Sequence, residues 1–246
     1  MHLDFHFYAI YVLCRCNGMS PENSKKVAYA SQYTDDATYG HEIEFENGGR
    51  FQQAISAHIV LRENMDIAQD MVREVAGLRN KPYILHRLGI VLHLYADTWS
   101  HRDSSGMGSE LNEVFVCRKI YVEISRFLSK NSHPEYRTEN VLKWRDIEKN
   151  FDDLFKKKAN FSKRCERLKD NINRSAFGFT CQSAERDLSY DDGEWFKDAV
   201  KVRINREGRR TYTKKDHFHI SDWKYFHDAA ASHRSFVLNE LFRPGF

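Results

Sequence analysis

Long apolar runs and proline are scarce in this 246-residue sequence. No apolar run approaches the roughly 18 residues of a membrane span. The opening segment, MHLDFHFYAIYVLCRCNG, has His and Asp where a signal peptide would carry a basic region. Only four prolines and twelve glycines interrupt the chain, which favours helices. These absences predict a cytoplasmic, helical protein without a transmembrane segment.

Several familiar motifs are also missing. The five cysteines are odd in number and form no CxxC pair, so zinc ribbons and dithiol redox sites are excluded and we expect reduced, mostly buried thiols. GxxxxGK[ST], GxGxxG, GxSxG and HExxH do not occur. Their absence argues against the common NTPases, dinucleotide enzymes, serine hydrolases and zincins.

Apolar residues recur at helical spacing through most of the chain. We expect helices from residue 5 to the stop at Asn17-Gly18, from the cap at Ser20-Pro21 to residue 35, and near 63–78, 82–101, 109–130, 139–157, 160–173, 184–200 and 221–241. A loop is expected around Asn47-Gly48-Gly49. Residues 201–213 alternate instead, which predicts a small basic β-hairpin. The expected fold is all-α, with residues 1–246 forming a single metal-binding helical domain.

The charges are unevenly distributed. Residues 118–174 carry 16 Lys and Arg against 9 Asp and Glu, residues 201–215 carry 7 against 1, and the remainder is acidic and rich in His. A basic surface beside such a region suits a site that holds cations and attracts an anionic substrate. The alternative is a solvent-exposed surface on which positive and negative charges are mixed and which binds no partner.

One predicted helix carries a stripe of possible metal ligands. In PYILHRLGIVLHLYADTWSH, the residues His86, His93, Asp97 and His101 are separated by 7, 4 and 4 positions, which keeps them on one helical face. The rest of the helix is apolar, so this face is expected to point inwards. Buried Asp and His are costly unless they are paired or bind metal. The alternative to a metal site is a hydrogen-bonded core network.

Three further groups of polar residues precede residue 60. In His2-Leu3-Asp4-Phe5-His6 the polar side chains alternate, so an extended start would place all three on one face. Asp35 and Asp36 end a predicted helix, and His58 lies in the next segment. Singly, each has an ordinary explanation as a cap, a solvated end or a core histidine.

Taken in order, these groups resemble the superfamily of zinc-dependent phospholipase C and the fungal zinc-dependent single-strand nucleases. The resemblance implies an all-α enzyme with a trinuclear zinc cluster. In that superfamily the mature N-terminal residue binds zinc, a His follows five residues later, and an Asp, a His and a His-x3-Asp pair with a further His complete the order. The matching ligands here are Met1, His6, Asp35 or Asp36, His58, His93, Asp97 and His101.

A closer resemblance is carried by MHLDFHFYA, AYASQYTDDA and LHLYADTWSHR. These segments look like an uncharacterised bacterial family of cytosolic proteins that lack signal peptides. The similarity covers residues 1–103 well and the remainder poorly.

The chain departs from the superfamily pattern in two places. Three residues, not five, separate Asp97 from His101, and no clean His-x3-Asp or His-x3-Glu pair follows residue 110. His133, in His133-Pro134-Glu135, is the first candidate for the missing ligand, and the weaker ones are His219 with Asp222, His227 and His233. Asp4 has no counterpart and is expected to replace or supplement the terminal amino ligand. The number of metal ions, one to three, stays open.

The expected function is that of a metal-dependent phosphoesterase acting on a phosphodiester in a nucleotide, nucleic acid or phospholipid. Divalent ions, zinc first and Mn or Fe as alternatives, activate a water and clamp the reacting oxygens. Asp97 is expected to bridge metals, and Asp35 or Asp36 to orient the water. Arg206 and Arg209 of the basic hairpin are expected to receive the phosphate of the anionic substrate.

Other classes of protein fit less completely. A non-catalytic, metal-stabilised helical binding or regulatory module would keep its coordination sphere closed. An HD-type phosphohydrolase is weakened by the lack of a His-Asp doublet among the N-terminal ligands, and a di-iron oxidase by the lack of paired Glu-x-x-His motifs. The sequence indicates no oligomeric state.

Overall fold

The computed structural model describes residues 2–37, 40–54, 65–102, 113–131, 134–155 and 160–242, except for the side chains of residues 65, 66 and 100–102. Helices dominate this part of the chain, as the sequence predicted. A π-helical segment η1 (Asp4–Ala9) continues into α1 (Ile10–Cys16). The other helical elements are α2 (Pro21–Asp36), α3 (Met65–Gly77), α4 (Ile84–Arg102), α5 (Glu113–Lys130), α6 (Trp144–Phe155), α7 (Phe161–Asn173), η3 (Ser183–Glu185), α8 (Glu194–Ala199), η4 (Phe218–Ile220) and α9 (Asp222–Leu241). None of the helices in these ranges combines the length and apolarity needed to cross a bilayer.

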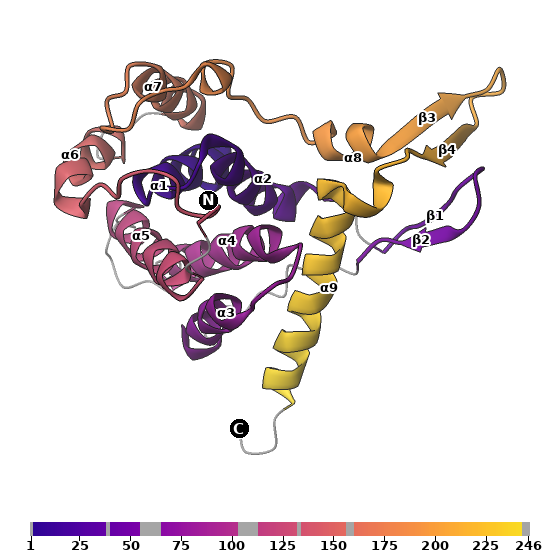
Figure 1. The fold of residues 1–246 in the computed structure, drawn as a ribbon, viewed down its shortest axis with the longest axis horizontal. Helices are drawn as coiled ribbons and strands as arrows, with labels where there is room; N and C mark the ends of the chain where they lie inside the picture. Colours follow the sequence, from indigo (N-terminus) through magenta and orange to yellow (C-terminus); the bar gives the residue numbers. More distant parts are fainter. Residues whose placement is uncertain are drawn as a thin grey trace.

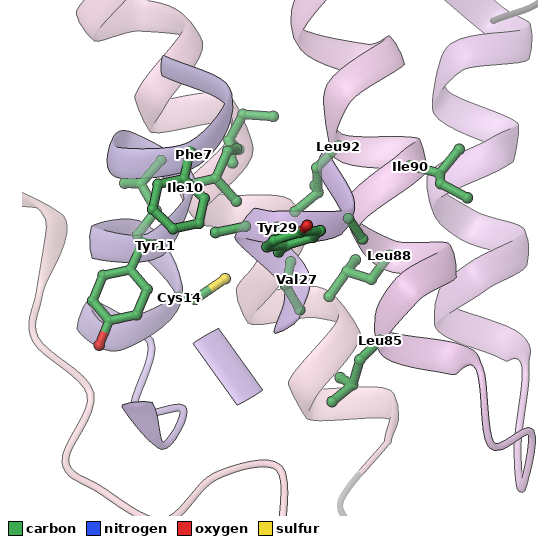
Figure 2. Close-up of a cluster of buried hydrophobic side chains, with 14 of the residues drawn as sticks. Phe7, Ile10, Tyr11, Cys14, Val27, Tyr29, Leu85, Leu88, Ile90 and Leu92 are labelled. Carbon is green, nitrogen blue, oxygen red and sulfur yellow. The ribbon is translucent and has the colours of Figure 1, made fainter. Parts of the chain in front are cut away.

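Helices α2 and α4 cross in backbone contact at Gly89. A Cβ at this position would lie 2.4 Å from the carbonyl oxygen of Val27 and 2.6 Å from the Cβ of Ala30. Only a glycine allows the two helices to approach this closely. Apolar side chains of η1, α1, α2 and α4 fill the space around the crossing (Figure 2). This contact fixes the middle of α2 against the first half of α4.

Two small antiparallel hairpins extend from one end of the molecule (Figure 1). Strands β3 (Val200–Ile204) and β4 (Arg210–Lys214) form the predicted basic hairpin. Strands β1 (Glu42–Glu44) and β2 (Arg50–Gln52) flank the predicted turn, although the sequence pattern predicted only a loop there. The two hairpins are joined, because the backbone N–H of Glu46 donates to the carbonyl of Tyr212 at 2.9 Å.

Two local expectations were wrong. Residues 2–6 are not extended, since the N–H groups of Phe5 and His6 both donate to the carbonyl of His2, at 2.8 and 2.9 Å. The chain therefore enters a helical turn at once, and its polar side chains diverge. The predicted helix 184–200 is helical only in η3 and α8. Between them the Asp191 carboxylate accepts from the N–H of Gly193 at 2.9 Å, a local bond that competes with helix formation.

Replacing the crossing glycine tests the α2–α4 contact. We expect Gly89→Ala to lower the free energy of unfolding by about 3 kcal/mol, because the new methyl group overpacks against backbone atoms. Urea unfolding measures the change. Gly77→Ala is the matched control, since a Cβ there meets nothing within 4 Å. It is expected to shift stability by no more than about 1 kcal/mol. Equal stability of the two variants would contradict the contact.

Helix α9 buries two histidines in a neutral form. His227 is 2% exposed and His233 is fully buried. Burial, with the charge of Lys224 as a smaller cause, lowers the pKa of His227 to about 3. Burial and the charge of Arg87 lower the pKa of His233 well below its usual range. As the pH falls, both imidazoles therefore bind protons at a higher pH in the unfolded chain than in the folded protein.

This asymmetry predicts sensitivity to acid. A histidine whose pKa is lowered by folding costs stability as the pH falls below about 6.5, by about 1.4 kcal/mol per pH unit until its folded pKa is reached. In His227→Phe, the loss of unfolding free energy between pH 6 and 4.5 is expected to be smaller by roughly 2 kcal/mol. Urea unfolding at several pH values measures it. A pH dependence in His227→Phe identical to that of the unaltered protein would contradict the assignment.

Candidate metal centre

Four of the predicted ligands meet where η1, α2 and α4 come together. Nε2 of His93 lies 3.3 Å from Oδ1 of Asp35 and 3.3 Å from Oδ2 of Asp97. Nε2 of His6 lies 3.3 Å from Oδ1 of Asp97. Three possible ligand atoms lie within 4.8 Å of one another, one each from His6, Asp35 and His93. We call His6, Asp35, His93 and Asp97 the His/Asp cluster.

Local structure explains the convergence. His93 and Asp97 are one turn apart on α4, so they share a face. Asp35 lies in the last turn of α2, which the crossing at Gly89 holds against this face. The helical turn of η1 presents His6 from a third direction, with its ring 4.0 Å from that of His93 between centroids.

The cluster is closed on one side and open on the other. The side chains of His6 and His93 are fully buried, whereas those of Asp97 and Asp35 are 14% and 36% exposed. The imidazoles are therefore fixed inside the protein, and the carboxylates lie at the edge that solvent reaches.

Burial and neighbouring charges set the protonation of the cluster. Burial, reinforced by the proximity of His93, lowers the pKa of His6 to about 4. Burial alone would also lower the pKa of His93, but hydrogen bonds to Asp35 and Asp97 raise it to about 9. The two histidines hold the pKa of Asp97 well below its usual range against the opposing effect of burial. Without a metal, His93 is thus the cation of the cluster and His6 is neutral.

The other aspartates near the cluster have different partners. Asp36 accepts hydrogen bonds from the hydroxyl of Tyr190 at 2.7 Å and from Nε2 of Gln32 at 3.0 Å. Asp4 is fully buried and pairs with Nε of Arg164 at 2.5 Å. The expected common face of Asp4 and His6 is therefore wrong, and Asp4 lies against α7.

Other predicted site residues lie away from the cluster or outside the described residues. His86, two turns before His93, pairs with Oδ1 of Asp222 on α9 at 3.0 Å. Arg206 and Arg209 are exposed in the turn between β3 and β4. Met1, His58 and His133 lie outside the described residues, as does the side chain of His101.

Two residues that shape this region were not predicted from the sequence. Tyr190 holds Asp36, and Arg164 neutralises Asp4. Both come from segments far along the chain, and no spacing in the sequence links residue 190 with 36 or 164 with 4. Only the folded arrangement identifies them.

The fold and site define a predominantly helical protein with a partly open His/Asp cluster. The chain belongs to a family of unknown function, DUF6765, whose model matches residues 1–65, 55–134 and 116–241. No match was found among curated proteins or among solved structures.

The charge balance of the cluster is directly measurable. In protein treated with a chelator, we expect NMR titration to give His93 a pKa near 9. Asp97→Asn is expected to lower it toward the ordinary value, because one of two hydrogen-bonding carboxylates is lost. Asp222→Asn, which removes the carboxylate of the separate His86 pair, is the control and is expected to leave His93 unchanged. An unchanged His93 in Asp97→Asn would contradict the geometry.

Proposed function

We propose that this protein is a metal-dependent phosphoesterase that binds one to three divalent ions, zinc first, at the His/Asp cluster and hydrolyses a phosphodiester. The observation that carries the proposal is the asymmetry of the cluster. Two buried imidazoles are fixed in place, while Asp35 remains 36% exposed. Structural zinc sites are closed, whereas catalytic sites keep an open position.

The donor set suits the ion. Imidazole nitrogen and carboxylate oxygen are ligands for Zn²⁺ and its first-row neighbours. Ligand atoms of three residues already lie within 4.8 Å of one another. His6 is neutral at physiological pH, as a metal ligand must be. Asp97, between the two histidines, offers an oxygen to each side of the cluster.

A bound divalent ion would supply activation of a water and neutralisation of charge on the phosphoryl group. The side chains would have different roles according to their positions in the cluster. His6, His93 and Asp97 would hold the ion from the buried side. Asp35, at the solvent edge, would orient the water, while Asp36 is held by Tyr190 and Gln32 and would support the end of α2. The exposed Arg206 and Arg209 would attract a nucleotide, nucleic acid or phospholipid phosphate.

Metal content and hydrolysis test the proposal together. Protein purified without a histidine tag is expected to contain one to three equivalents of zinc by elemental analysis and to hydrolyse bis(p-nitrophenyl) phosphate. Chelation should abolish hydrolysis, and added Zn²⁺ should restore it. Asp97→Asn is expected to weaken metal binding and hydrolysis by at least about tenfold to a hundredfold.

The matched control is Asp222→Asn, which breaks a His–Asp pair of similar length outside the cluster. It should retain both metal and hydrolysis. Folded protein without metal, or metal retained in Asp97→Asn, would contradict the assignment of the cluster. Metal that Asp97→Asn loses, but without hydrolysis of any phosphodiester, would favour the non-catalytic, metal-stabilised module.

A further inference from the structure

A cavity of about 430 Å³ lies beside the end of α2, bounded by β1, β4, α8 and α9. Its volume falls within the range of small-molecule sites. Asp36 lines it, whereas the preceding residue, Asp35, faces His93 in the cluster. The cavity is thus a separate site next to the cluster, and ligand binding there does not require the proposed phosphoesterase activity.

The charged lining of the cavity is mainly acidic, and His41 and Nε1 of Trp223, a buried donor without an acceptor among the described residues, also line it. Three carboxylates, from Asp36, Glu42 and Asp192, face one cation, Arg210. Gln53 is 6% exposed, and its Oε1 is buried without a hydrogen-bond donor among the residues that the structure describes. A buried acceptor normally receives a hydrogen bond, so a ligand that donates to this oxygen would supply the missing bond.

The apolar lining is aromatic. Trp223 and Phe196 stand edge to face with ring centroids 5.3 Å apart, and Tyr33 and Tyr212 also line the cavity. Aromatic faces attract cations and pack against alkyl chains. The carboxylates do not form a metal site, because within the described ranges only His6, Asp35 and His93 gather three ligand atoms closely enough.

We propose that this cavity binds a protonated primary or secondary alkylamine. The ammonium N–H groups donate to Oε1 of Gln53 and to the surrounding carboxylates, and the alkyl chain lies against Trp223 and Phe196. The excess of negative charge in the lining, three carboxylates against Arg210, disfavours a simple anion as the preferred ligand. Arg210 contacts an acidic group where the amine carries one.

Binding of 1,5-diaminopentane to the full chain tests the proposal. We expect the indole N–H resonance of Trp223, assigned with Trp223→Phe, to shift on titration, and 1,5-pentanediol, the neutral analogue, to produce no shift. Asp192→Asn should weaken binding by about three- to fivefold, and Arg210→Gln should strengthen it by a similar factor, as expected for partly exposed charges. Gln53→Met should weaken it by about fivefold.

Asp216→Asn is the matched control, because it removes one exposed negative charge that does not line the cavity. It should leave the affinity unchanged. Equal weakening by Asp216→Asn and Asp192→Asn, equal binding of the diol, or no shift with the amine would each overturn the proposal. Tighter binding of O-phosphoethanolamine that Arg210→Gln abolishes would support it and assign the amine to a phosphate-bearing ligand.

Discussion

The backbone contact between α2 and α4 at Gly89 is the constraint on which the candidate site depends. Gly89, His93 and Asp97 follow one another at intervals of four residues, so the face of α4 that lets α2 approach also carries the ligands. On α2, Ser31 touches the same contact and Asp35 lies one turn further on. The two helices thus meet through small residues and present polar side chains to each other one turn beyond. Any side chain at position 89 would separate the helices and move Asp35 away from His93.

The electrostatics of the His/Asp cluster differ from those of an ordinary buried pair. His86 is buried and faces a single carboxylate, that of Asp222, which is 33% exposed and also pairs with Lys26. In the cluster, Asp97 lies between two imidazoles whose ring centroids are 4.0 Å apart, Asp35 contacts only His93, and only one imidazole is protonated. The ring of His6 is buried and neutral, so only His93 supplies a positive charge opposite the two carboxylates. A divalent cation would replace the proton on His93, use the neutral nitrogen of His6, and balance both carboxylates. This charge balance is the electrostatic argument for the metal ion proposed at the cluster.

The sequence predicted the parts of the site that follow from helical periodicity. The spacing of His93 and Asp97 set their common face, and the end of the helix near residue 35 placed an aspartate beside them. The choice between Asp35 and Asp36 stayed open, because consecutive helical residues differ by about 100° and the packing partner decides which one faces inwards. Periodicity also could not predict η1, where two hydrogen bonds to His2 override the alternating pattern. Strands β1 and β2 have three residues each, too few for an alternating pattern to be recognised. Their pairing with the second hairpin joins segments far apart in the sequence and so arises only in the fold.

The end of α2 links the cluster and the cavity. A helix C-terminus carries partial negative charge and is stabilised by cations, yet α2 ends with two aspartates and has no basic residue in its last turn. Taken alone, this ending is unfavourable. Protonated His93 compensates one aspartate, and the hydroxyl of Tyr190 bonds to the other without supplying charge. A metal ion beside Asp35 would take the place of the charge on protonated His93, and an ammonium group beside Asp36 would supply the positive charge that Tyr190 does not. Because both ligands would stabilise one structural element, occupation of either site would favour the helix end that the other requires.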